Sequence, residues 1–161
     1  MALRTTVPIA EWRVSADPAE ELITYALGSC LGIAVHDPVA CVGGLLHVML
    51  PTSSVNPEKA AARPGMFVDT GVPLLFKDCY AMGAVKARMI ATVAGGASQA
   101  GVDADHFQIG RRNMLMLRKL LWKNGVLLQA EDVEGSDSRT MSLDVGTGAV
   151  RLRINGQERD L

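Results

Sequence analysis

Cys30 and His47 are the residues of this chain best placed to form a nucleophile and its base. They lie on two apolar segments, residues 30–36 and 41–50, joined by the turn-forming sequence Asp37-Pro38-Val39-Ala40. A four-residue loop in this hairpin places Cys30 directly opposite His47. Opposed residues share one face of a sheet with Cβ atoms about 5 Å apart. That spacing allows an imidazole to accept a proton from a thiol.

The same register pairs His36 with Cys41 at the turn end of the hairpin. The two pairs are about 20 Å apart along the strands, so they cannot share one metal ion. Two ordinary alternatives remain, in which Cys30 is a small buried hydrophobe and His47 a hydrogen-bonded histidine on a half-buried strand. A single bulge residue would also send the thiol and the imidazole to opposite faces.

The strand before Cys30 is interrupted by Leu27-Gly28-Ser29. Backbone amides at Gly28, Ser29 and Leu31 can therefore turn outward. Such amides are able to hold the negative oxygen of a tetrahedral intermediate. A nucleophilic cysteine also needs this kind of access. These features favour a cysteine hydrolase, and they do not name its substrate.

Thr24 lies on the strand that leads into this interruption, and its hydroxyl can orient the imidazole of His47. We expect Cys30 to be the most reactive of the three thiols. Its pKa should lie below the usual value of about 8.5 because His47 stabilises the thiolate. Cys79 lies on the apolar stripe of a predicted helix and should be a core residue.

The composition predicts one domain over residues 1–161, with 48% apolar and 20% charged residues. A net charge of −1 without a long basic run gives no reason to expect nucleic acid as a partner. We expect no membrane insertion and no signal peptide, which makes the cytoplasm the expected compartment. The three cysteines have no CxxC spacing, which favours free thiols and gives no metal site.

The apolar patterns predict an α+β fold in which mixed or antiparallel sheets pack together, flanked by two main helices. Residues 51–65 have no apolar period and are predicted to form a long surface loop. The expected helices begin at Asp69 or Thr70 and at Arg111, ending before Gly83 and Gly125. The expected strands outside the hairpin cover residues 11–14, 22–27, 86–93, 126–133, 139–145 and 149–154.

The chain resembles the CheD family of chemoreceptor glutamine deamidases in a series of blocks spread over residues 8–154. The most specific is Leu-Gly-Ser-Cys30, followed by His47 in His-Val-Met-Leu-Pro. The other blocks are Thr24-Tyr-Ala, Asp37-Pro38, Gly43-Gly-Leu-Leu, Arg63-Pro-Gly-Met-Phe-Val-Asp69, Ala94-Gly-Gly-Ala97, Ile109-Gly-Arg-Arg-Asn113 and Ala130-Glu-Asp132.

The resemblance implies a catalytic triad of Cys30, His47 and Thr24, all present at the spacing of the family. It also implies a fold like the catalytic domain of the cytotoxic necrotizing factor toxins. Two positions depart from the family pattern: Glu134 stands where a glycine is usual and Phe67 where tyrosine is common. The Glu134 departure bears on the shape of its loop, and neither departure involves the triad.

The implied reaction converts glutamine side chains of methyl-accepting chemotaxis receptors to glutamate through a cysteine thioester, without a cofactor. Hydrolysis of glutamate methyl esters would follow the same route. The resemblance also implies binding to a CheC-type phosphatase, so the alternative is a regulatory module with weak enzymatic activity. A cysteine hydrolase acting on another protein or on a small amide is a third reading.

Overall fold

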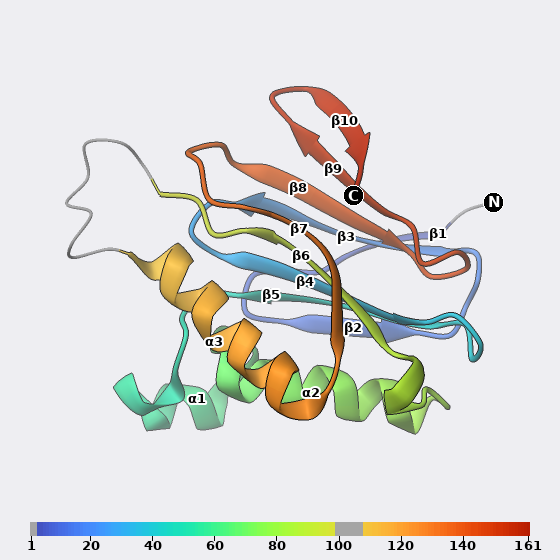
Figure 1. The fold of residues 1–161 in the computed structure, drawn as a ribbon, viewed down its shortest axis with the longest axis horizontal. Coiled ribbons are helices and arrows are strands. Elements are labelled where there is room, and N and C mark those ends of the chain that lie inside the picture. Colours follow the sequence, from blue (N-terminus) through green and yellow to red (C-terminus); the bar gives the residue numbers. More distant parts are fainter. Residues whose placement is uncertain (1–2, 99–107) are drawn as a thin grey trace.

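Two five-stranded sheets packed face to face form the body of the protein, and helices cover the outer face of one of them (Figure 1). The computed structural model describes residues 3–98 and 108–161. The first sheet has the order β1 (Leu3–Thr6), β3 (Glu20–Leu27), β8 (Arg139–Asp144), β9 (Val150–Ile154) and β10 (Gln157–Asp160). The second has the order β2 (Trp12–Ser15), β5 (Val42–Val48), β4 (Leu31–Asp37), β6 (Ile90–Gly95) and β7 (Leu127–Val133).

Both sheets are mixed, because β1 pairs with β3 and β6 pairs with β7 in parallel while the other pairs are antiparallel. The helices are α1 (Pro57–Ala62), α2 (Val68–Ala81) and α3 (Ile109–Asn124), with short 3-10 turns η1 (Ser53–Val55), η2 (Pro64–Met66) and η3 (Lys86–Arg88). The α+β prediction with two main helices is confirmed. The likeness to the toxin domain stays a prediction.

Two apolar cores hold these layers together. One lies between the sheets and includes Leu22, Leu45 and Met141. The other lies between the second sheet and the helices and includes Val35, Leu75 and Leu117. Strands β4 and β5 are buried at every residue because the first sheet covers one face and the helices cover the other. No helix within the described ranges is both long and apolar enough to cross a membrane.

The apolar stripe of α2 packs as the sequence predicted, and Cys79 is fully buried in the core. The expectation that Met82 belongs to this buried stripe is wrong, since Met82 follows the end of the helix and is 48% exposed. The helix also begins earlier than expected, after Phe67, without a side-chain cap. Asp69 instead accepts hydrogen bonds from the amide and hydroxyl of Ser53.

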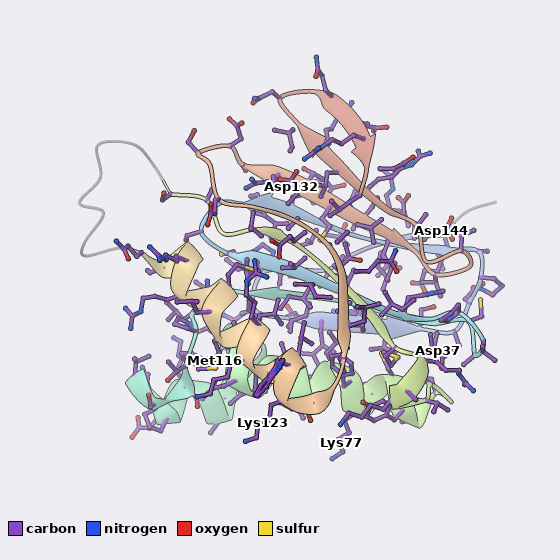
Figure 2. The ribbon with its side chains drawn as sticks, viewed as in Figure 1. Asp37, Lys77, Met116, Lys123, Asp132 and Asp144 are labelled. Atoms are coloured by element: carbon purple, nitrogen blue, oxygen red, sulfur yellow. The ribbon has the colours of Figure 1, made fainter. Side chains whose placement is uncertain are left out.

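The register of the β4–β5 hairpin differs from the prediction. Asp37 pairs with Val42, which places His47 opposite Gly32 and not opposite Cys30. The turn moves because the Asp37 carboxylate accepts the amides of Val39 and Ala40 from within the strand. Figure 2 labels Asp37 and Asp144 at the end of the sheets where the turns after β4 and β8 lie.

Two other segments also differ from the sequence prediction. The expected loop at residues 51–65 contains η1, α1 and the start of η2. Local capping explains α1, because Pro57 occupies its first turn and the Asn56 side chain accepts the amide of Lys59. The expected strand at 86–93 begins only at Ile90, after η3.

Candidate active site

Thr24 and His47 meet in the space between the two sheets. Thr24 Oγ1 on β3 lies 2.8 Å from His47 Nδ1 on β5, so one hydrogen bond connects the sheets. Thr24 is 0% exposed and His47 is 2% exposed. The sequence anticipated this pair, although nothing in it showed that the contact crosses from one sheet to the other.

A third partner decides which nitrogen of His47 carries the proton. The hydroxyl of Thr24 donates to the backbone carbonyl of Val7 at 2.8 Å. A threonine hydroxyl has a single proton and a carbonyl can only accept, so Thr24 Oγ1 must accept from His47 Nδ1–H. The Nε2 atom therefore carries a lone pair. It is buried and has no hydrogen-bond partner among the described residues.

The segment around Val7 also holds the backbone of His47. The amide of Ala10 donates to His47 O at 2.8 Å, and the amide of His47 donates to Glu11 O at 3.1 Å. This segment joins β1 of the first sheet to β2 of the second. His47 is consequently fixed at its ring by Thr24 and at its backbone by Ala10 and Glu11, all of which come earlier in the chain.

Cys30 lies immediately before β4 and is half-buried against the core between the sheets. Gly32 is the residue opposite His47, and Cys30 is two positions before Gly32. Cys30 packs against the core between the sheets, where His47 also meets Thr24, so the two side chains lie on the same side of β4 and β5. The direct opposition is wrong, but the shared face is retained. No hydrogen bond joins Cys30 Sγ to His47 Nε2 within the described structure.

Burial sets the protonation states of both residues. It lowers the pKa of His47 to about 4, because the charged imidazolium loses its hydration between the sheets. Burial also raises the pKa of the Cys30 thiol, although its own backbone amide works in the opposite direction. The expected lowering of the Cys30 pKa is wrong for the free protein. The resting pair is a neutral thiol beside a neutral imidazole.

The loop before Cys30 is held through its carbonyl groups. Gly28 O accepts the amide of Ala97, and Cys30 O accepts the amide of Gly96, both at 2.9 Å. Ser29 O accepts a hydrogen bond from the side chain of Asn113 at 3.1 Å. Three successive carbonyls are therefore fixed to the scaffold.

The amides of the same loop divide into two kinds. The Gly28 amide donates to Ala26 O at 3.1 Å, so this predicted oxyanion donor is already engaged. The amides of Ser29 and Cys30 donate no hydrogen bond to any other residue in the described parts of the chain. Leu31 is the first residue of β4, between β5 and β6. Ser29 and Cys30 thus offer amides next to the nucleophile that no other described residue engages.

Gly95 supports this loop from β6. Its φ is 115°, and a Cβ atom there would lie 2.2 Å from Cys30 O, so a larger residue cannot occupy this position. The buried Arg139 donates to Gly95 O at 3.2 Å, to Glu134 O at 2.7 Å and to Asp132 at 2.8 Å. Glu134 keeps a left-handed backbone, with φ of 70°, at the position where the family usually has glycine.

The other candidate side chains lie apart from this site. His36 pairs with Gly43, not with Cys41, and its Nε2 atom lies 2.8 Å from Val145 O. Cys41 Sγ lies 3.6 Å from the same carbonyl. All three cysteines are free, as predicted. His106 is outside the described residues.

An apolar cavity of about 250 Å³ lies between α2 and α3, lined among others by Phe76 and Leu121, and none of the three candidate residues lines it. Among the described residues no group of three or more His, Cys, Asp or Glu side chains gathers at metal-binding distance.

Sequence reasoning missed three residues that hold the site. Asn113 belongs to the Gly-Arg-Arg-Asn block, which was a usable signal. Arg139 gave no such signal, because its neighbours Ser138 and Thr140 are polar. Val7 acts through its backbone carbonyl, which every residue has, so the residue type at this position gives no signal.

Residues 49–154 match the family described as CheD, chemotactic sensory transduction. A probable chemoreceptor glutamine deamidase CheD 1 of Syntrophus aciditrophicus is 51% identical over 150 residues, which cover 93% of each chain. A probable chemoreceptor glutamine deamidase CheD of Solibacter usitatus is 47% identical over 155 residues, which cover 96% of this chain and 91% of the relative.

Among solved structures, a Neisseria meningitidis protein of family DUF152 covers 77% of this chain and 53% of its own, with 12% identity. Its TM-score is 0.43. The family match begins beyond His47, so the arrangement of Cys30, His47 and Thr24 is described by geometry alone. By the family match and by relatives that are similar over nearly its whole length, this chain belongs to the CheD family.

Proposed function

We propose that this protein is a glutamine deamidase of chemoreceptors, with Cys30 as nucleophile, His47 as base and Thr24 as the residue that orients the base. One observation carries the proposal: the Val7–Thr24–His47 hydrogen bonds leave Nε2 as a buried acceptor, without a partner in the described parts of the chain, on the side shared with Cys30. The relatives named chemoreceptor glutamine deamidases support the choice of substrate.

The reaction begins when His47 Nε2 takes the proton of Cys30 Sγ as the sulfur attacks the side-chain carboxamide carbon of a glutamine. The carbonyl oxygen becomes negative, and the amides of Ser29 and Cys30 can donate to it. The C–N bond then breaks as the imidazolium returns its proton to the leaving nitrogen, which departs as ammonia. The product on the enzyme is a thioester.

The second half of the reaction uses the same base. His47 Nε2 takes a proton from water, the hydroxide attacks the thioester carbon, and the C–S bond breaks with the proton returned to the sulfur. The substrate is released as glutamate. A glutamate methyl ester would form the same thioester and lose methanol in place of ammonia.

Proton transfer must accompany attack, because the resting pair is neutral. Burial opposes both the thiolate and the imidazolium. The proton should therefore pass from the sulfur to Nε2 as the new carbon–sulfur bond forms, once a bound substrate has brought the groups together. The Cys30 thiol should therefore react slowly in the free enzyme and become reactive when the receptor helix that carries the glutamine is bound.

The test incubates the protein with a cytoplasmic fragment of a chemoreceptor and measures the mass change of glutamine-containing peptides. Cys30→Ala and His47→Ala should abolish the conversion. Cys41→Ala and Cys79→Ala serve as matched controls, since both thiols lie apart from His47, and they should retain it. Conversion by Cys30→Ala would refute the cysteine mechanism.

We also propose that residues 1–161 act as one cysteine hydrolase domain in the cytoplasm and that a CheC-type phosphatase binds at the mouth of the same site. Cys30 is half-buried, so its thiol adds little to a contact surface. Cys30→Ala should therefore still bind CheC. If the surfaces coincide, CheC should inhibit deamidation competitively, and unchanged rates at saturating CheC would place its surface elsewhere.

A further inference from the structure

We propose that Asn113 is a positioning residue, which holds the Cys30 loop and the His47 strand at a fixed separation. The inference rests on the catalytic roles proposed above and adds to them a residue of helix α3. Asn113 is 0% exposed, although it is polar and comes from the second turn of a helix whose neighbouring arginines face solvent.

The geometry of its amide group is specific. Nδ2 donates to Ser29 O at 3.1 Å and to Met49 O at 3.1 Å. Ser29 immediately precedes Cys30, and Met49 follows His47 by two residues. Both hydrogens of one amino group are therefore used, one for the loop of the nucleophile and one for the strand of the base. Only a side chain with two diverging donors can make this bridge.

The first turn of α3 is docked so that Asn113 reaches both carbonyls. Gly110 faces Gly96, and a Cβ atom at Gly110 would lie 2.5 Å from Gly96 O. Gly96 is the residue whose amide holds Cys30 O. Residues 110 and 113 are three apart, so they lie on the same face of the helix. One residue of this face allows the close approach and the other makes the bridge.

The other end of the Asn113 side chain supports a positioning role. Its Oδ1 atom is buried and has no hydrogen-bond partner among the described residues. A buried unpaired acceptor is unfavourable for folding, and an apolar residue of the same size would avoid it. What the asparagine contributes in return is the bridge, because an apolar residue would leave Ser29 O and Met49 O without this donor.

The experiment compares Asn113→Leu, which keeps the shape and removes both donors, with Asn113→Ser, which keeps one donor. Each variant is assayed at a temperature where its unfolding curve shows it to be folded. We expect Asn113→Leu to lower kcat on the receptor fragment by about 100-fold, with KM changed by less than about threefold, because small displacements of reacting groups have effects of this size. Asn113→Ser should fall between Asn113→Leu and the wild type.

Leu117→Ala is the matched control, since Leu117 is fully buried one turn further along the same helix and touches neither carbonyl. It should lose stability while keeping kcat within about twofold of the wild type. Full activity of folded Asn113→Leu would overturn the inference. An equal loss of kcat in Leu117→Ala would also overturn it, because activity would then follow stability alone.

A second measurement separates this inference from the proposed function. Amide hydrogen exchange, followed by mass spectrometry of peptides that cover residues 28–32 and 47–50, reports whether the bridge holds the loop and the strand. We expect faster exchange in both segments of Asn113→Leu than in Leu117→Ala, whether or not the wild type deamidates receptors. Wild-type exchange rates in both segments of folded Asn113→Leu would overturn the positioning role. Absence of deamidation by the wild type would overturn only the proposed function.

Discussion

Lowering the pH should destabilise this protein through His47. Burial lowers the pKa of His47 from 6.5 to about 4, so the folded state binds a proton less readily than the unfolded chain. The unfolded state then carries more protons between these two values, and stability falls as pH falls through this range. The full difference corresponds to about 3 kcal/mol, of which about 2 kcal/mol should be lost between pH ~7 and pH ~5.

The assay is urea unfolding of the wild type and of His47→Gln at a series of pH values. Glutamine cannot titrate, so the difference between the two curves of unfolding free energy against pH isolates His47 from the carboxylates. The wild type should lose about 2 kcal/mol more than His47→Gln between pH ~7 and pH ~5. Above pH ~7 the two curves should be parallel, because His47 is neutral in both states.

Parallel curves throughout the acid range would refute this reasoning. They would mean that the imidazole is solvated or charged in the folded state, and the buried Nε2 acceptor would not exist as described. The same pKa predicts that kcat/KM keeps its value as pH falls through about 6.5 and declines only near 4, since the free enzyme needs a neutral His47.

Thr24→Val removes the hydroxyl between the sheets, so it should lower the free energy of unfolding by about 2 kcal/mol and kcat by about 100-fold. Thr24→Ser should lie between Thr24→Val and the wild type in both measurements. Normal kinetics in Thr24→Val would show that His47 needs no orienting partner. Burial would raise the pKa of Asp37, but hydrogen bonds from Arg88 and three backbone amides outweigh it and hold the pKa well below its usual range. Asp37→Asn should therefore cost about 3 kcal/mol in urea unfolding near neutral pH, and the difference from the wild type should begin to shrink only as pH falls below about 4. Glu134→Gly should raise the free energy of unfolding by about 1 kcal/mol without changing kcat, since Glu134 has a φ of 70° and glycine adopts this conformation freely. A lower melting temperature in Glu134→Gly would contradict this prediction.

The local pattern of residues determined much of the fold. The apolar stripes of α2 and α3, the interruption before Cys30 and the turn at Asp37 each arise from neighbours in the sequence, and each lies within a few residues of its predicted place. The α+β class followed from the same patterns. The sequence did not predict the short helices between residues 51 and 65, because local caps and not an apolar period stabilise them.

The sequence identified the residues of the candidate site but not the way in which they are arranged. Cys30 and His47 share a face whether the register is the predicted one or the observed one, because the two differ by an even number of residues. The pairing itself depends on how the Asp37 carboxylate caps the turn, which hairpin length alone does not specify.

Only the tertiary structure decided the protonation of the pair. The tautomer of His47 depends on a carbonyl at Val7, and the pKa values of His47 and Cys30 depend on how fully the two sheets exclude water. The bridge from Asn113 likewise needs a helix that follows Cys30 by some eighty residues. Desolvation and bridging hydrogen bonds are properties of segments packed together from distant parts of the chain, and a sequence names those segments without stating the distances between them.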